Sequence, residues 1–223
     1  MIESAQALHR LPAAALRRQL RERLATQSFG DSDLRLGAFS GATLERLRAL
    51  MPAHPMRAAV LIPLVDRAED LTVLLTRRAS DLKHHAGQIS FPGGRMEPGD
   101  RDAVAAALRE TEEEIGLRPE FIEVIGKLPD HVVISGYRVT PVVGLVRPGF
   151  ELVLDPQEVF ATFEAPLRHL LDPATHARRS QQIGGEVLET FELPWGEHNI
   201  WGATAGMLLT LIEVLGGSPN HAN

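Results

Sequence analysis

The chain has 223 residues, 44% of them hydrophobic, so it is long enough to bury a core and to form one domain with terminal additions. It contains no cysteine, which excludes a disulfide framework and a thiolate metal site and leaves oxygen and imidazole as metal ligands. Its formal charge of -6 argues against a general nucleic-acid-binding surface, and we expect a small-molecule substrate.

The first residues show no charged segment followed by an apolar one, and no apolar run approaches the roughly 18 residues of a membrane span. We therefore expect a cytoplasmic protein without a membrane partner. Leucine and alanine recur at near-helical spacing over residues 5–26 and predict an amphipathic helix. A second, short helix is predicted at 42–50. We expect the two helices to form an N-terminal helical extension, residues 1–55, that packs on the core. Whether the protein is a monomer or a homodimer stays open.

Strands dominate the next part of the chain. Two apolar segments, Ala58–Val65 and Leu71–Arg78, are separated by a short polar stretch and predict a hairpin. A helix follows within Ser90–Leu117, and further elements are predicted as strands at 121–128, 137–146, 158–167 and 186–194 and as a helix at 200–216. This order predicts an α/β domain with α/β/α layers over residues 56–215, and we expect a disordered tail at 216–223.

Four glutamates lie within five residues of the central helix. At about 100° per residue, Glu110, Glu113 and Glu114 fall on one face, whereas Glu112 points nearly the opposite way. Like charges at this spacing repel one another. A solvated acidic surface is one explanation for such a run, and a bound cation is the other.

Two features favour the cation. The acidic face carries only alanine in the preceding turns, which leaves room beside the carboxylates, and arginine at i,i+4 can relieve Glu113 and Glu114 but not Glu110. Mg²⁺ and Mn²⁺ prefer carboxylate oxygen. The helix is predicted to pack into the core through a separate stripe made of Val104, Leu108, Thr111 and Ile115.

The segment around these glutamates resembles the Nudix box, GX5EX7REUXEEXGU, in which U is aliphatic. The stretch "RETEEEIGL" matches it from Arg109 to Leu117, except that Thr111 stands where an aliphatic residue is usual. The first half has one extra residue between Gly94 and Arg109, so Asp100 takes the acidic place.

A second motif precedes the box. The stretch "LLTRRASDLKHHAGQISFPGG", from Leu74 to Gly94, resembles the signature LLTXR(S/A)XXXRXXXGXXXFPGG of the coenzyme A pyrophosphatase branch. Lys83 stands where that pattern has arginine, which keeps the positive charge but loses the bidentate fork. The two motifs together span Leu74 to Leu117.

The resemblance implies a Nudix fold, with a mixed sheet between helices. It also implies a Nudix diphosphatase that hydrolyses the diphosphate bond of coenzyme A or acyl-coenzyme A with Mg²⁺ or Mn²⁺, giving 3',5'-ADP and (acyl-)4'-phosphopantetheine. It assigns the metal to Glu110, Glu113 and Glu114, with Glu113 also a candidate base, and gives Arg109 the task of orienting a glutamate. The implied substrate-binding residues are Arg78, Lys83, Gln88, Gly93 and Gly94.

One further carboxylate is expected from the strand near residue 158. Glu158 is the candidate for completing metal binding or acting as base, and Glu164 competes with it. Two other functions stay open: hydrolysis of another nucleoside diphosphate derivative, such as ADP-ribose or NADH, and nucleotide binding without cleavage by a Nudix-like module. The complete set of glutamates argues against the binding module.

Overall fold

A computed structural model describes residues 8–30, 33–35, 54–79, 87–133, 135–183 and 186–216. Its central feature is the pairing of β1 (Met56–Asp66) with β7 (Tyr137–Val146), which run parallel over their whole length. β2 (Leu71–Arg78) pairs with the end of β1 in an antiparallel hairpin, as predicted. Both faces of β1 are covered, which explains why its sequence is almost continuously apolar.

The other strands of this mixed sheet lie around the central pair. β4 pairs with β1, β5 and β6 pair with β7, and β3 and β8 pair with β2. Their bounds are β3 Ile89–Ser90, β4 Gly93–Arg95, β5 Ile122–Lys127, β6 His131–Val133 and β8 Val159–Pro166.

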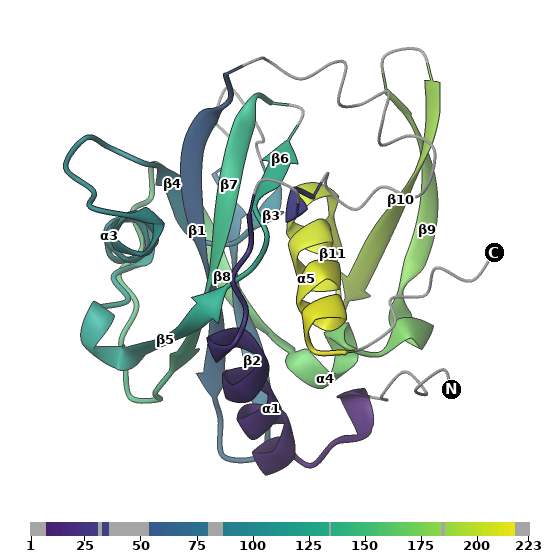
Figure 1. The fold of residues 1–223 in the computed structure, drawn as a ribbon, viewed down its shortest axis with the longest axis horizontal. Coiled ribbons are helices and arrows are strands. Elements are labelled where there is room, and N and C mark those ends of the chain that lie inside the picture. Colours follow the sequence, from purple (N-terminus) through teal and green to yellow (C-terminus); the bar gives the residue numbers. More distant parts are fainter. Residues whose placement is uncertain are drawn as a thin grey trace.

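A second, three-stranded antiparallel sheet contains β9 (Ala177–Ile183), β10 (Glu186–Trp195) and β11 (His198–Trp201). The sequence predicted only β10. The predicted C-terminal helix is α5 (Gly202–Val214), which lies between the two sheets (Figure 1) and is buried along most of its length. Two short helical elements, α4 (Leu167–Leu170) and η4 (Pro173–Thr175), connect β8 to β9.

α3 (Ala103–Ile115) covers the opposite face of the mixed sheet (Figure 1). It begins at Asp102, whose carboxylate accepts a hydrogen bond from the Ala105 N–H at 2.8 Å, and it ends at Gly116, which has a φ of 69°. With α3 on one side and α5 on the other, the structure has the predicted α/β/α layers. η3 (Pro119–Phe121) then leads into β5.

The face of α3 that packs on the sheet differs from the prediction. Val104 and Leu108 are only half-buried, whereas the alanines expected to leave a free face are buried in a small core. Because alanine is small, the helix can approach the sheet closely. Thr111 and Ile115 are buried, as expected. The buried alanines and the sheet residues that they contact are Ala103, Ala106, Ala107, Ala59, Leu61 and Val142.

The N-terminal part of the chain packs into the main core, which it shares with α5. After η1 (Leu8–Arg10), α1 (Ala13–Ala25) buries Leu16, Leu20 and Leu24 in the main core. The helix predicted at 42–50 and residues 217–223 of the tail lie outside the described residues, and the domain limits stay a prediction. In the described part of the chain no helix is long and apolar enough to cross a membrane.

Candidate active site

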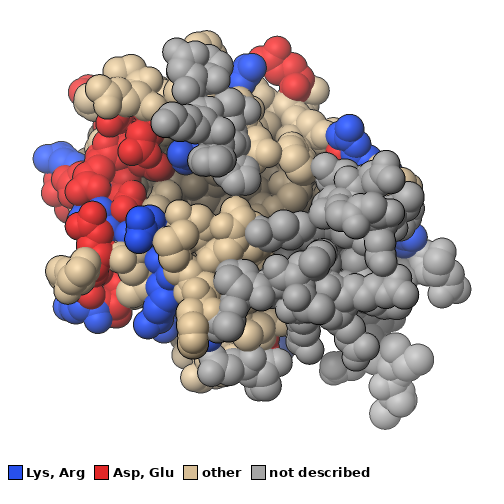
Figure 2. All heavy atoms as spheres, turned by 90° about the horizontal axis from the view of Figure 1, so that it is seen from above, with Lys and Arg blue, Asp and Glu red and all other residues tan. Residues whose placement is uncertain are grey.

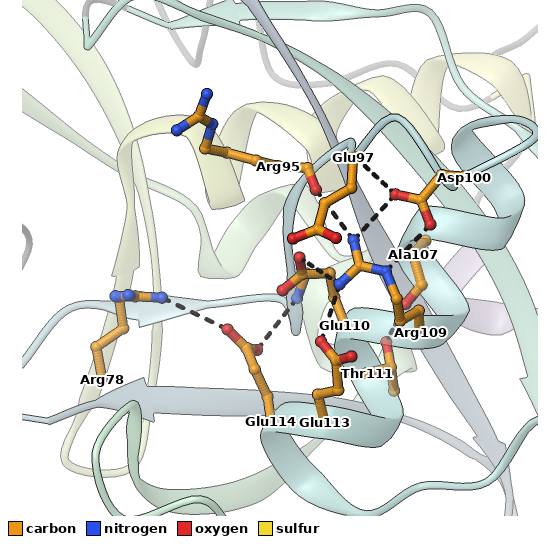
Figure 3. A network of polar contacts seen from close by, with 11 residues as sticks. Arg78, Arg95, Glu97, Asp100, Ala107, Arg109, Glu110, Thr111, Glu113 and Glu114 are labelled. Atoms are coloured by element: carbon orange, nitrogen blue, oxygen red, sulfur yellow. Dashed lines mark hydrogen bonds and ion pairs between the residues drawn. The ribbon is translucent and has the colours of Figure 1, made fainter.

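Glu114 is the most buried carboxyl group of α3, with 4% of its surface exposed. Its Oε2 accepts a hydrogen bond from the Gly93 N–H at 3.1 Å, and its Oε1 lies 3.8 Å from Nη1 of Arg78 (Figure 3). Burial raises the pKa of Glu114 to about 8, against the opposing effects of Gly93 and Arg78, and the adjacent Glu158 carboxyl adds to the rise. A cation beside Glu114 would favour its charged form and oppose this rise.

Glu110 lies one turn earlier, against the glycine turn that precedes the helix. A Cβ atom on Gly94 would lie 2.4 Å from Oε2 of Glu110, so this close approach requires glycine at position 94. Burial raises the pKa of Glu110, Arg109 opposes the rise, and Glu113 and Glu158 add to it. Burial thus outweighs the Arg109 contact and disfavours the charged form of Glu110.

Arg109 connects the loop before α3 to the glutamates. Its Nε and Nη2 donate to the two carboxylate oxygens of Asp100, both at 3.0 Å, and its Nη1 donates to Glu110 at 2.9 Å and Glu113 at 2.8 Å (Figure 3). Such bidentate, charge-assisted hydrogen bonds fix direction as well as distance. Asp100 holds the Arg109 side chain in place, and its own pKa is lowered by that contact. Nη2 of Arg109 also donates to the Arg95 carbonyl at 3.2 Å.

The ion pairs around the glutamates differ in part from those inferred from helical spacing. Arg109 does pair with Glu113, but it also pairs with its neighbour Glu110, which the sequence left without a partner. Arg118 pairs with Glu120 at 2.9 Å instead of relieving Glu114. Neighbouring residues on a helix do not normally face each other. Helical spacing therefore does not predict the contact between Arg109 and Glu110, which Nη1 of the long Arg109 side chain makes.

The three predicted metal ligands do not lie in equivalent positions. Glu113 has 59% of its side chain exposed and is turned toward Arg109, whereas Glu110 and Glu114 are held close to the sheet. Glu112 is exposed and belongs to none of these contacts, as expected from its helical position. In Figure 2, acidic side chains gather on the side of the molecule where Figure 1 places α3.

Glu158, the residue immediately before β8, brings a further carboxyl group close to Glu110 and Glu114. Its carboxyl adds to the rise in the pKa of both Glu114 and Glu110. Glu164, the competing candidate, is bound by the Arg67 guanidinium and the Thr72 hydroxyl. Burial alone would raise the pKa of Glu164, but these hydrogen bonds lower it. Glu164 is therefore the anion of a separate ion pair, whereas Glu158 acts electrostatically on Glu110 and Glu114.

A divalent cation fits the carboxyl groups of Glu110, Glu114 and Glu158. They supply oxygen donors only, which suits a hard cation, and a cation bound there would favour the charged forms of Glu110 and Glu114, which burial disfavours. No three acidic or histidine side chains in the described ranges stand close enough together to enclose a metal ion by themselves. The site would therefore close around a cation through small side-chain movements and with water or substrate oxygens.

The predicted substrate-binding residues lie on the strands beside this carboxyl cluster. Arg78 is at the end of β2, where its N–H donates to the Gln88 carbonyl at 3.0 Å, and Gly93 and Gly94 form the start of β4. Gly93 has a φ of 146° and lies against the backbone of β1. Lys83 lies outside the described residues. The structure thus places Arg78, Gly93 and Gly94 next to the glutamates, and Gln88 pairs with the backbone of Arg78.

The fold and the site together define an α/β/α enzyme domain with a carboxylate-bearing helix against a glycine turn. Residues 55–183 match the model of the NUDIX domain, and the chain belongs to the Nudix family. The predicted fold and the prediction of a Nudix-family hydrolase are confirmed. Hydrolases of this family generally use divalent metal ions.

Similar proteins carry the same family description. An uncharacterized Nudix hydrolase NudL from Enterobacter sp. (strain 638) is 42% identical over 164 residues, which cover 73% of this chain and 84% of that protein. The NudL of Cronobacter sakazakii is 40% identical over 183 residues, covering 79% and 94%. Among solved structures, a C. elegans Ap4A hydrolase binary complex is 22% identical, with a TM-score of 0.44, and covers 49% of this chain and 80% of that one.

Proposed function

We propose that this chain hydrolyses the diphosphate bond of coenzyme A or acyl-coenzyme A, using Mg²⁺ or Mn²⁺ and releasing 3',5'-ADP and (acyl-)4'-phosphopantetheine. The observation that carries the proposal is the gathering of the Glu110, Glu114 and Glu158 carboxyl groups beside the Gly93–Gly94 turn. The upstream motif from Leu74 to Gly94 supports coenzyme A as the substrate. A cytoplasmic location and a small-molecule substrate, without nucleic-acid or membrane partners, belong to the same proposal.

The carboxyl groups divide into ligands and a proton acceptor. A bound divalent cation would compensate charge on the diphosphate oxygens and make water a better nucleophile. We assign Glu110 and Glu114 as the principal ligands, since both are held against the sheet by short backbone and side-chain contacts. Glu158 and Glu113 are the candidates for taking the proton from the attacking water. Glu158 is favoured because the Glu113 carboxylate is occupied by Arg109.

Positive side chains beside the cluster would bind the substrate. The Arg78 guanidinium lies 3.8 Å from Glu114 and remains partly exposed, so it can contact a phosphate bound at the cation. Lys83 and Gln88 belong to the same upstream motif and are assigned to the coenzyme A end of the substrate. Gly93 and Gly94 leave the backbone accessible for close approach of the diphosphate.

A product assay tests the substrate. Purified protein is incubated with coenzyme A, ADP-ribose, NADH or nucleoside triphosphates, each with Mg²⁺ and with a chelator. Release of 3',5'-ADP from coenzyme A only in the presence of metal is the expected result. Turnover of ADP-ribose or NADH in place of coenzyme A would show that the assigned substrate is wrong.

Matched glutamine variants test the proton acceptor. Glu158→Gln is expected to lower kcat by about 10²-fold or more, because general-base catalysis contributes about 10² to 10⁴. Glu113→Gln is expected to have a smaller effect, and Glu112→Gln, on the exposed face of the same helix, none. A larger loss in Glu113→Gln than in Glu158→Gln would reverse the assignment.

A further inference from the structure

The loop between β7 and β8, residues 147–158, binds the C-terminal end of α3. The Val153 N–H donates to the Ile115 carbonyl at 3.0 Å, and the Asp155 N–H donates to the Glu114 carbonyl at 2.9 Å. Carbonyl groups in the last turn of a helix have no partner within the helix, so the loop supplies the missing donors. Gly116 makes room for this contact, because a Cβ atom there would lie 2.8 Å from the Val153 nitrogen.

Asp155 also forms the turn that leads to Glu158. Its Oδ1 accepts a hydrogen bond from the Gln157 N–H at 2.8 Å, and its carbonyl accepts from the N–H groups of Glu158 at 3.1 Å and Val159 at 2.9 Å. An aspartate that binds the backbone two residues later stabilises a tight turn. The backbone N–H and carbonyl of Asp155 therefore bond to the backbones of Glu114 and Glu158, respectively, and its side chain stabilises the turn between them.

The second support for Glu158 comes from the sheet. Its carbonyl accepts from the Ala79 N–H at 2.9 Å, at the point where β2 and β8 change register. Like charges that share a partly buried site repel each other, and Glu114 and Glu158 would separate if their backbones could move. The Asp155 turn on one side and the β2 contact on the other prevent this movement.

We infer that Asp155 is a positioning residue that sets the separation of the Glu114 and Glu158 carboxyl groups for cation binding. It does not contact the cation or the substrate itself. The inference rests on the proposed function, because it gives these two glutamates a common ligand. Polar groups that orient metal ligands typically contribute about 10-fold to 100-fold in metal affinity or activity.

The chain contains a matched control for a purely structural role. Asp172 is also followed by proline, and its Oδ1 accepts from the Ala174 N–H at 3.0 Å, so it stabilises the same kind of turn at η4. None of its hydrogen bonds or ion pairs in the described residues involves a glutamate of α3. Removing either aspartate side chain should therefore cost similar local stability, but only one removal should affect the site.

The experiment compares the full-length wild type with Asp155→Ala, Asp155→Asn and Asp172→Ala. Mn²⁺ binding is measured by calorimetric titration without substrate, alongside Tm, kcat and KM. Asp155→Ala is expected to lose about tenfold in Mn²⁺ affinity and about tenfold in kcat, with KM changed less than about twofold. Asp155→Asn keeps the acceptor oxygen and should recover most of both. Asp172→Ala should lower Tm about as much as Asp155→Ala while leaving affinity and kcat unchanged.

The inference would be overturned by unchanged Mn²⁺ affinity in Asp155→Ala, or by equal losses of affinity in Asp155→Ala and Asp172→Ala. A wild-type protein that binds no Mn²⁺ would overturn it as well. Failure of the wild type to cleave coenzyme A would instead reject the proposed substrate. The titration contains no substrate, so it would still decide the role of Asp155 in that case.

Discussion

The buried histidine of β6 should make the stability of this protein depend on pH in a defined way. His131 has no exposed surface, and its Nε2 lies 3.1 Å from the Thr210 hydroxyl oxygen. That hydroxyl donates to the Gly206 carbonyl at 3.0 Å, so its oxygen accepts a hydrogen bond from Nε2–H, and Nδ1 carries the lone pair. Nδ1 has no hydrogen-bond partner among the described residues, so a proton added there would have no acceptor.

Burial lowers the pKa of His131 to about 3, with Arg35 adding to the decrease and Asp130 opposing it. In the unfolded chain the pKa of histidine is about 6.5. Between these values the unfolded state binds the extra proton, so the free energy of unfolding decreases as the pH falls below about 6.5. From pH 7 to pH 4.5 this one side chain removes about 2 to 3 kcal/mol.

Urea unfolding of the wild type, His131→Gln and Thr210→Val between pH 7 and pH 4.5 measures this contribution. Glutamine can donate a hydrogen bond to Thr210 but does not titrate, so the stability difference between wild type and His131→Gln should change by about 2 to 3 kcal/mol in favour of the variant at low pH. Thr210→Val retains the histidine and should follow the wild-type slope. Parallel curves for wild type and His131→Gln would refute the assignment of a neutral, buried His131.

Three further substitutions test the site and its scaffold. Glu114→Gln should lower kcat by about 10²-fold or more. It should leave the Tm of the metal-free protein unchanged or higher, because it removes a carboxyl whose charged form is disfavoured by burial. A lower Tm with full activity would contradict both roles of Glu114. Gly94→Ala should displace the Glu110 carboxylate, since the new Cβ would lie 2.4 Å from it, and should reduce activity about tenfold or more. Gly99→Ala is the control: a Cβ there would have no atom within 4 Å, so activity should not change. Leu20→Ala removes a fully buried side chain of α1 and should cost about 2 to 5 kcal/mol in urea unfolding at unchanged KM; a loss below about 1 kcal/mol would show that α1 is not part of the core.

The elements with strong local patterns could be predicted from the sequence. β1 and β2 are apolar segments joined by a short polar turn, and α3 has a helix-favouring interior between an aspartate cap and a terminating glycine. β9 was missed because its sequence, "ARRSQQI", lacks an apolar alternation, and it becomes a strand by pairing with β10. Helical spacing predicts an inner face of α3 that contains Val104, Leu108, Thr111 and Ile115, and only the last two are buried. Alanines take the rest of that face because they let the helix approach the sheet closely.

In the candidate site, too, some features follow from the sequence and others only from tertiary contacts. Glu110, Glu113 and Glu114 belong to one helix, so their common face and the repulsion between them follow from about 100° of rotation per residue. The sequence by itself therefore determined the family, the acidic helix and the need for a compensating charge. Only the tertiary structure decided that the Glu158 carboxyl acts on Glu114 and that Asp155 connects the backbones of these two glutamates. These contacts join segments about 40 residues apart, and their geometry depends on strand pairing and loop docking, which no local pattern in the chain encodes.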